Sequence, residues 1–405
     1  MKKALAAVVL FSYLAMNASP SYAWCYTWYN RVVQAGRGAT YAMMSVDDYL
    51  PWNSGGSAKA VGMGGAFTAV ANDLGGAVEY NPAGLTYLKT LNIGTLGIAK
   101  RSNTIDAQGN KKAKWTIAPT YAGAALKIGH FALGLSRKQP ESTSSYQKFK
   151  SLQSNILAPD GYRMTYNTLS DKFDTSGLNT YVVTGAIKIS RLSLGTNFNI
   201  IKGDIKRTQR GRTFNSNKRF DSTETVSFDG YTVDVGALMD MGPLRLGASA
   251  RNLKGAVDVV RSISWYDNVG FNGNGVVLNW ASTSTKERKE QFPRTYSAGA
   301  AILLGKILTV DLDYVVTDGR DANKALGRLG AELAVIPGFL FARGGVRSDF
   351  KNLVQDQNQK TMEYFVGAGL KLAMLTVDAS ASLIQAKAGA DGGDMTGSVG
   401  ATLKF

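Results

Sequence analysis

The chain has 405 residues but contains only one cysteine and one histidine. The single cysteine, Cys25, excludes an internal disulfide. Many metal sites and acid–base centres depend on these two residue types, and the sequence has neither an HExxH nor a GxSxG motif. The lone His130 falls in a predicted turn. We therefore expect no enzyme, no catalytic residue, no metal and no cofactor.

The sequence also lacks an apolar run of about 18 residues, the length that a membrane-spanning helix requires. A shorter apolar stretch, residues 4–16, follows two lysines and precedes the small-residue sequence at 21–23. This order predicts a secretory signal peptide over residues 1–23, cleaved between Ala23 and Trp24. Because tryptophan rather than cysteine would follow the cut, we expect no lipidation.

Acidic residues are scarce relative to basic ones, 30 against 46, so the formal net charge is +16. Such a charge suits nucleic-acid binding, but an exported chain seldom meets nucleic acid, and the basic residues are scattered. We therefore expect no nucleic acid. Two interpretations stay open: a solvated surface, or attraction to anionic lipid headgroups or sugars at a membrane rim.

From residue 91 onward the sequence alternates with a period of two. Between residues 308 and 314, for example, apolar side chains alternate with Thr309, Asp311 and Asp313. Each such segment is about 10 residues long and has one apolar face and one polar or glycine face, which is typical of a transmembrane β-strand. A soluble β-sandwich alternates too, but it seldom places so many charges in mid-strand.

The connections between these segments alternate in length. Short turns are predicted at 129–130, 190–191, 241–243, 305–306, 337–338 and 373–374, and longer polar loops near 101–112, 139–176, 207–223, 262–290, 318–324, 349–360 and 387–393. Outer-membrane barrels have short turns on one side and long loops on the other. The pattern predicts an all-β fold, a transmembrane antiparallel β-barrel of about 14 strands over residues 91–405.

A barrel of this width encloses a lumen that side chains cannot fill. The only sizeable block outside the strands is residues 24–90, which we interpret as an N-terminal extension followed by a plug, or hatch. Within it, residues 66–72 suit a short helix, interrupted by Asp73 and a glycine pair. Asn81, Pro82 and Gly84 stand at the first, second and fourth positions favoured by a type I turn.

Several charged residues fall on the predicted lumen face of the strands. They could face the plug or water, or they could pair with one another across the wall and stabilise it, and we expect the second arrangement for most of them. The paired acids could also bind a cation, although a polar lumen face is the commoner explanation. The residues are Arg245, Arg251, Asp311, Asp313, Arg328, Glu332, Arg343 and Arg347.

The proposed plug carries a family resemblance. The run from Gly62 to Asp73 (GMGGAFTAVAND) and the later Asn81-Pro82-Ala83-Gly84-Leu85 resemble the N-terminal motif of the PorV/PorQ family of FadL-like outer-membrane barrels. The resemblance extends over most of the chain from residue 62. It implies a barrel of 14 strands with a hatch, whose motif residues here are Gly62, Met63, Gly64, Gly65, Asp73, Asn81, Pro82, Ala83 and Gly84.

The family implies two functions that the sequence leaves open. FadL-type members take up hydrophobic molecules through a lateral opening, whereas PorV serves type IX secretion by receiving exported proteins. We expect a carrier for hydrophobic small molecules, with a secretion accessory as the alternative. The last strand ends in Phe405, which resembles the assembly signal of bacterial outer-membrane proteins. The expected location is the bacterial outer membrane, and the expected partners are its lipids, the barrel assembly machinery, and a hydrophobic ligand or an exported protein.

Overall fold

The computed structural model describes residues 56–405 except 106–110, 140–145, 151–155, 158–162, 165, 175–176, 214–218, 271–276, 291, 306, 319–323, 350–361 and 385–394. The predicted signal peptide, its cleavage site at Ala23 and Trp24, and residues 24–55 of the predicted extension lie outside the described residues.

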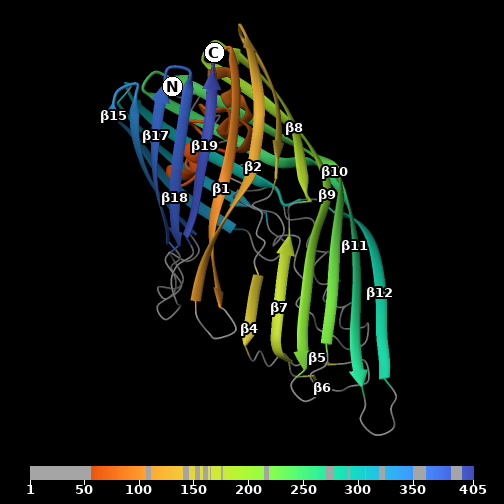
Figure 1. Ribbon diagram of the computed structural model, residues 1–405. Helices are drawn as coiled ribbons and strands as arrows, with labels where there is room; N and C mark the ends of the chain where they lie inside the picture. The colour runs from red at the N-terminus through yellow and green to blue at the C-terminus, as the bar shows by residue number, and fades with distance from the viewer. Residues whose placement is uncertain are drawn as a thin grey trace.

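Fourteen strands of the described chain close into an antiparallel barrel (Figure 1), as the alternation predicted. Each strand pairs with the next in the ring, and β1 closes the ring by pairing with β19. In ring order the strands are β1 (Leu91–Ile105), β2 (Lys111–Ile128), β3 (Phe131–Lys138), β8 (Asn179–Ile189), β9 (Leu192–Thr213), β10 (Arg219–Met241), β11 (Leu244–Gly270), β13 (Thr295–Leu304), β14 (Leu308–Thr317), β15 (Lys324–Ile336), β16 (Leu340–Asp349), β17 (Met362–Leu372), β18 (Leu375–Ile384) and β19 (Met395–Lys404).

The short turns join consecutive wall strands at one end of the barrel, at all six predicted places. Four of them contain a glycine with positive φ, a backbone conformation that tight hairpin turns require and that glycine adopts at little cost. The chain terminus lies at the same end, where the amide of Phe405 donates to the carbonyl of Leu91 at 2.8 Å. We call this the turn end and the opposite one the loop end.

Two of the predicted long loops are largely strands. The segment 139–176 contains β4 (Tyr146–Lys150), β5 (Ile156–Leu157), β6 (Arg163–Met164) and β7 (Tyr166–Asp174), and the segment 262–290 contains the end of β11 and β12 (Val277–Glu290). A third, 207–223, is mostly the ends of β9 and β10. Of these strands, β4, β7, β12 and the ends of β9, β10 and β11 continue the barrel sheet and project from the loop end (Figure 1), whereas β5 and β6 form a separate two-stranded sheet. The prediction missed them because strands outside a membrane need no apolar face, so their alternation disappears although their pairing continues.

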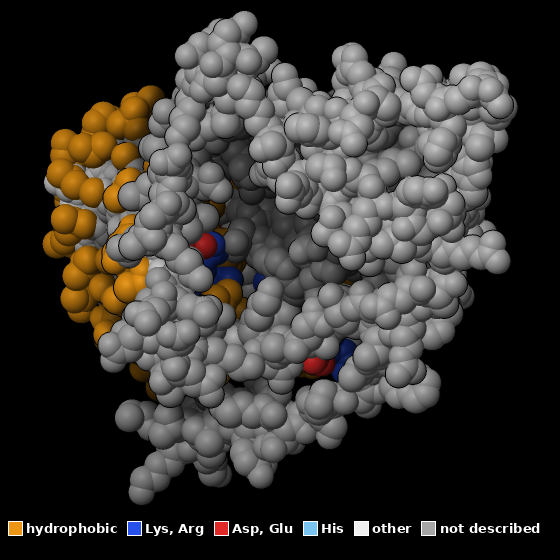
Figure 2. Space-filling view, turned by 90° about the horizontal axis from the view of Figure 1, so that it is seen from below, with side chains coloured by type: hydrophobic (Ala, Val, Ile, Leu, Met, Phe, Trp, Pro, Cys, Tyr) orange, Lys and Arg blue, Asp and Glu red, His pale blue; other side chains and the backbone are white. Residues whose placement is uncertain are grey.

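Strand β14 shows the alternation of the wall between an apolar outer face and a polar inner face. On β14 the outward Leu312 is 58% exposed, whereas the inward Asp311 and Asp313 are 0% and 1% exposed. Hydrophobic side chains cover one outer side of the molecule in Figure 2. Nearer the loop end, Phe198 and Tyr231 stack with their ring centroids 5.4 Å apart, as in the aromatic girdles of such barrels. No helix in the described part of the chain is long and apolar enough to cross a membrane.

Within the described residues, three short helices precede the wall: α4 (Ala58–Gly62), α5 (Leu74–Glu79) and the 3₁₀ helix η1 (Pro82–Tyr87). Each helix has an N-cap residue whose side chain accepts a hydrogen bond from a backbone amide of the first turn. The N-cap residues of α4, α5 and η1 are Ser57, Asp73 and Asn81, in that order. The predicted helix at 66–72 is wrong, because these residues form turns between α4 and α5. Asp73 begins a helix rather than interrupting one.

Candidate functional site

Residues 56–88, which we call the inner segment, lie inside the ring of strands near the turn end. Its Met63, Phe67 and Val70 are fully buried. In Figure 1 these helices stand within the curve of the wall strands. Figure 2, viewed from the loop end, shows a hollow with acidic and basic side chains visible inside it.

The inner segment packs against wall glycines at the same level of neighbouring strands. A Cβ added at Gly195, Gly236, Gly247, Gly330 or Gly345 would approach an atom of the inner segment to under 3.0 Å. Several of these glycines are direct cross-strand partners: Gly195 with Gly236, Gly247 with Gly299, and Gly330 with Gly345. We call these six residues the glycine belt. Because the wall lacks side chains there, the backbone of the inner segment contacts the backbone of the barrel.

Two aspartates on β14 bind the backbone of the inner segment. Asp313 Oδ2 accepts hydrogen bonds from the Phe67 amide (2.8 Å), the Thr68 amide (2.9 Å) and the Thr68 hydroxyl (2.8 Å). Asp311 Oδ2 accepts from the Val70 amide at 3.3 Å. These carboxylates, which the sequence also allowed as a cation site, here satisfy N–H groups that would otherwise be buried without a partner.

Most of the other predicted lumen charges also reach the inner segment. Arg328 donates to the carbonyl of Gly65 at 3.1 Å, and Arg245 donates to that of Val70 at 3.3 Å. Glu332 accepts from Lys59 of the inner segment at 2.7 Å. The expectation that most of these charges pair only with one another is therefore wrong.

Two of the predicted charges, Arg343 and Arg347, pair within the wall. Arg343 lies 2.6 Å from Glu332 and 2.8 Å from Asp378, and Arg347 pairs with Glu363. These pairs match the stabilising role that we expected of the whole set.

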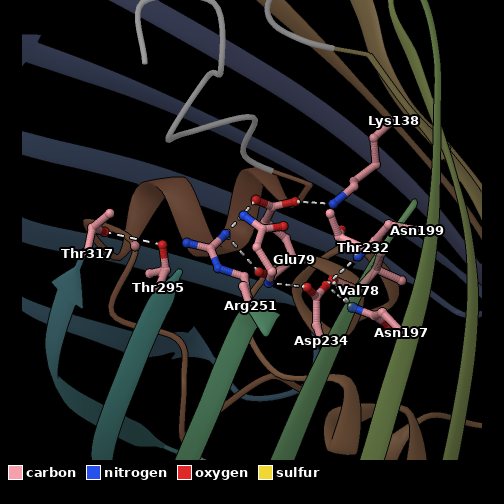
Figure 3. Close-up of polar contacts among 12 residues, drawn as sticks. Val78, Glu79, Lys138, Asn197, Asn199, Thr232, Asp234, Arg251, Thr295 and Thr317 are labelled. Atoms are coloured by element: carbon pink, nitrogen blue, oxygen red, sulfur yellow. Dashed lines mark hydrogen bonds and ion pairs between the residues drawn. The ribbon is translucent and has the colours of Figure 1, made fainter. Parts of the chain in front are cut away.

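Glu79, at the end of α5, is held from two sides of the lumen (Figure 3). Lys138 on β3 donates to Glu79 Oε2 and Arg251 on β11 to Glu79 Oε1, each at 3.0 Å. Beside this clamp, Asp234 on β10 accepts from Asn199 at 2.8 Å and from Asn197 at 3.1 Å (Figure 3). Nothing in the sequence pointed to Glu79, because its partners Lys138 and Arg251 are 59 and 172 residues away in the chain.

The Asn81 side chain ties the motif to the wall. Its Nδ2 donates to the carbonyls of Thr68 (2.9 Å), Ala237 (3.0 Å) and Ala248 (3.3 Å). The amide of Gly84 donates to the Asn81 carbonyl at 2.9 Å, which is the hydrogen bond of the predicted turn.

The other motif residues shape the chain and its contacts. Asp73 accepts from Ser57 and from the Gly76 amide, each at 2.6 Å. Gly64 and Gly65 have positive φ, and Gly62 faces Gly367 on the wall. Met63 lies against Gly330, while Pro82 and Ala83 lie against Gly195.

The second half of the inner segment meets the wall mainly through apolar side chains. Apolar side chains of the inner segment and of β1, β2, β3 and β8 form one cluster, which we call the apolar seam. The seam comprises Ala58, Leu74, Ala77, Val78, Leu85, Leu88, Leu96, Ile98, Tyr121, Ala125, Ala132, Val182 and Ala186.

A second apolar cluster lies towards the loop end, centred on β9, β10 and β11. It comprises Leu178, Ile201, Ile205, Val226, Phe228, Val257 and Phe292, and we call it the upper cluster. Phe228 and Phe292 are in ring contact, with centroids 6.4 Å apart. An apolar inner surface at this level distinguishes the barrel from a water-filled pore, whose lumen is polar.

Tyr87, the last residue of η1, contacts charged side chains of the wall at the turn end. Its hydroxyl donates to Asp240 at 2.6 Å, and the cations of Arg245 and Lys188 lie 4.0 Å and 4.3 Å from its ring centroid. Burial raises the pKa of the Tyr87 phenol, and the hydrogen bond to Asp240 raises it further.

Solved structures with the same architecture are toluene transporters. TbuX of Ralstonia pickettii aligns with a TM-score of 0.58 at 15% identity, over 87% of this chain and 100% of TbuX. TodX of Pseudomonas putida aligns with a TM-score of 0.55 at 14% identity, over 85% of this chain and 96% of TodX. The fold shared with these proteins is an antiparallel β-barrel. No family model matches the sequence, and no curated protein matches it by sequence.

This fold and the apolar exterior place the chain in the bacterial outer membrane. The narrower PorV/PorQ resemblance stays a prediction, since no family model supports it. The lateral opening that the family resemblance implies also stays a prediction. Over the described residues of β3 and β8, the pairing that joins β2, β3, β8 and β9 is continuous and shows no gap.

Proposed function

We propose that the chain carries small hydrophobic molecules across the outer membrane and that the inner segment is its plug. The observation that carries this proposal is the upper cluster, a group of buried apolar side chains on the inner wall between the plug and the loop end. A molecule entering from the loop end would bind there, out of water. The toluene transporters with the same fold support the same class of cargo.

The two halves of the plug differ in how they are held. The first half is fixed by buried hydrogen bonds to Asp311, Asp313 and Arg328. Moving it would leave buried charges and N–H groups without partners, which costs several kcal/mol in all, at roughly 1–3 kcal/mol per group.

The second half faces β1, β2, β3 and β8 across the apolar seam. A hydrophobic molecule that enters the seam exchanges one set of apolar contacts for another, so this exchange itself costs little free energy. We therefore propose that cargo passes the plug between α5 or η1 and these strands. The polar contacts that this movement has to break include the clamp on Glu79, the hydrogen bond from Asn197 to the Val78 carbonyl and that from Thr86 to Ser193.

Uptake by cells tests the carrier function. A deletion strain and the same strain complemented with the chain would be compared for uptake of toluene and of a long-chain fatty acid. We expect complementation to restore uptake of at least one of these probes. Equal uptake with and without the chain, for both probes, would refute the proposal.

The alternative, a PorV-like secretion accessory, has one observation in its favour. The sheet of β9, β10, β11 and β12 projects beyond the barrel at the loop end, where exported proteins would meet it (Figure 1). This alternative predicts that deletion changes the secreted and surface-attached proteome while leaving uptake unchanged. An unchanged proteome would exclude it.

A further inference from the structure

A shallow apolar hollow of about 660 Å³ lies over β2, β3, β8 and β9. Its sides include outward side chains such as Phe131 and Leu133, which are 64% and 57% exposed. Since this wall faces the membrane, such exposure is expected of a barrel, but a hollow in the wall is not required by the fold.

Gly185 on β8 makes the hollow. Its cross-strand neighbours on the same outer face are Leu133 on β3 and Thr196 on β9. A Cβ at Gly185 would meet nothing within 4 Å. The next outward row, nearer the turn end, contains Phe131, Ile187 and Leu194. The wall therefore has a dip at Gly185, flanked by larger side chains.

The hollow extends over one leaflet of the bilayer. Ser190, in the turn after β8, lies five residues beyond Gly185, which corresponds to about 16 Å along the strand at roughly 3.3 Å per residue and to about 12 Å along the membrane normal for a strand tilted by about 45°. Half of a hydrocarbon core about 30 Å thick is close to that length.

The mouth of the hollow at the turn end carries a cationic group, Arg191. Arg191, in the turn between β8 and β9, is exposed, and so is His130 in the turn between β2 and β3. Neither of these two turns contains an acidic residue. An anionic group at the membrane surface would therefore meet a positive charge at this mouth.

From these features we infer that the hollow binds a glycerophospholipid of the leaflet at the turn end. One acyl chain lies over Gly185, and the phosphate lies at Arg191. A phospholipid supplies both an apolar chain of one-leaflet length and an anionic group at its end. A second copy of this chain would also offer an apolar surface to the hollow, but it would have to displace the membrane lipid from this face of the barrel.

Native mass spectrometry of the full chain, extracted from membranes in mild detergent, tests the inference. The measured quantity is the fraction of barrels that retain phospholipid. Gly185→Leu fills the hollow, and Gly344→Leu is the matched control, since Gly344 also faces outward, beside Val366, and has open space around it. Arg191→Gln removes the charge, and Lys371→Gln on the other side of the barrel is its control.

We expect Gly185→Leu to lower retention roughly tenfold, because it displaces about two methylene groups of the acyl chain. Arg191→Gln should lower retention about two- to fivefold, as expected for a surface charge pair. Both controls should match the wild type. Heat-dependent mobility on denaturing gels identifies folded barrels and excludes misfolding as the cause.

Equal retention in Gly185→Leu and Gly344→Leu would overturn the inference, as would a wild type that retains no phospholipid. A dimeric species that disappears only in Gly185→Leu would assign the hollow to a second copy instead. The outcome is independent of the uptake measurements, because the hollow lies outside the wall and the proposed carrier path lies inside it.

Discussion

Replacing Asp313 with alanine would remove the strongest single attachment of the plug to the wall. Its Oδ2 accepts two backbone amides and one hydroxyl of the inner segment, all within 2.9 Å. In the variant, the amides of Phe67 and Thr68 lose their partner in a site where Asp313 itself is 1% exposed. The barrel strands keep their own ladder hydrogen bonds, so the cost falls mainly on docking of the plug.

The size of the effect follows from the cost of stranding a buried donor, about 1–3 kcal/mol for each group. Two stranded amides therefore weaken docking by roughly 2–6 kcal/mol. The lower bound of about 2 kcal/mol already corresponds to about a 30-fold larger population of the undocked segment.

Hydrogen exchange measured by mass spectrometry on the protein in lipid nanodiscs checks this. Peptides that cover 64–71 should exchange at least about 30-fold faster in Asp313→Ala than in the wild type. Peptides from β16 and β17 should keep their protection. Asp229→Ala is the control, because Asp229 forms only an exposed pair with Lys202 at 3.9 Å.

Unchanged exchange over 64–71 would refute the role of Asp313 as an anchor. Equal loss of protection in the plug and in the wall strands would also refute it, because the carboxylate would then stabilise the barrel as a whole.

Further predictions concern the belt, the clamp and the upper cluster. Gly345→Val should displace the plug at a cost of about 1–3 kcal/mol from overpacking, visible as raised ion conductance in planar bilayers, whereas the outward Gly344→Val should not raise it. Glu79→Gln should speed hydrogen exchange of α5 roughly two- to tenfold, as expected for two partly exposed ion pairs, while Glu363→Gln, which affects a pair within the wall, should leave α5 unchanged. Phe228→Ala should reduce uptake of the hydrophobic probe several-fold by removing buried apolar surface from the upper cluster; uptake equal to that of the outward Phe198→Ala would contradict this.

The wall strands were predictable because their signals, alternation along each strand and the residues of each tight turn, depend only on residues close together in the sequence. A strand between lipid and lumen must alternate, so the parity of Asp311 and Asp313 already assigned them to the inner face. Tight turns need positive φ, so residues such as Gly129 and Gly242 marked the strand ends. No such alternation marks β12, because a strand outside the membrane does not face lipid and therefore needs no apolar face.

The plug contacts were not predictable for a different reason. The clamp joins Glu79 to Lys138 and Arg251, which are 59 and 172 residues away in the chain. The glycine belt was visible only as an excess of glycine, since its meaning depends on which strands are neighbours. Asp73 was read as a helix breaker, although an aspartate before an apolar run is also a common N-cap.

The central claim, that residues 56–88 close the barrel, is tested most directly by single-channel recording in planar bilayers. The wild type would be compared with a chain that lacks residues 56–88, after heat-dependent mobility has shown that both are folded barrels. We predict that the wild type conducts almost no ions and that the deletion produces large, discrete conductance steps. Equal conductance in the two proteins would contradict the account.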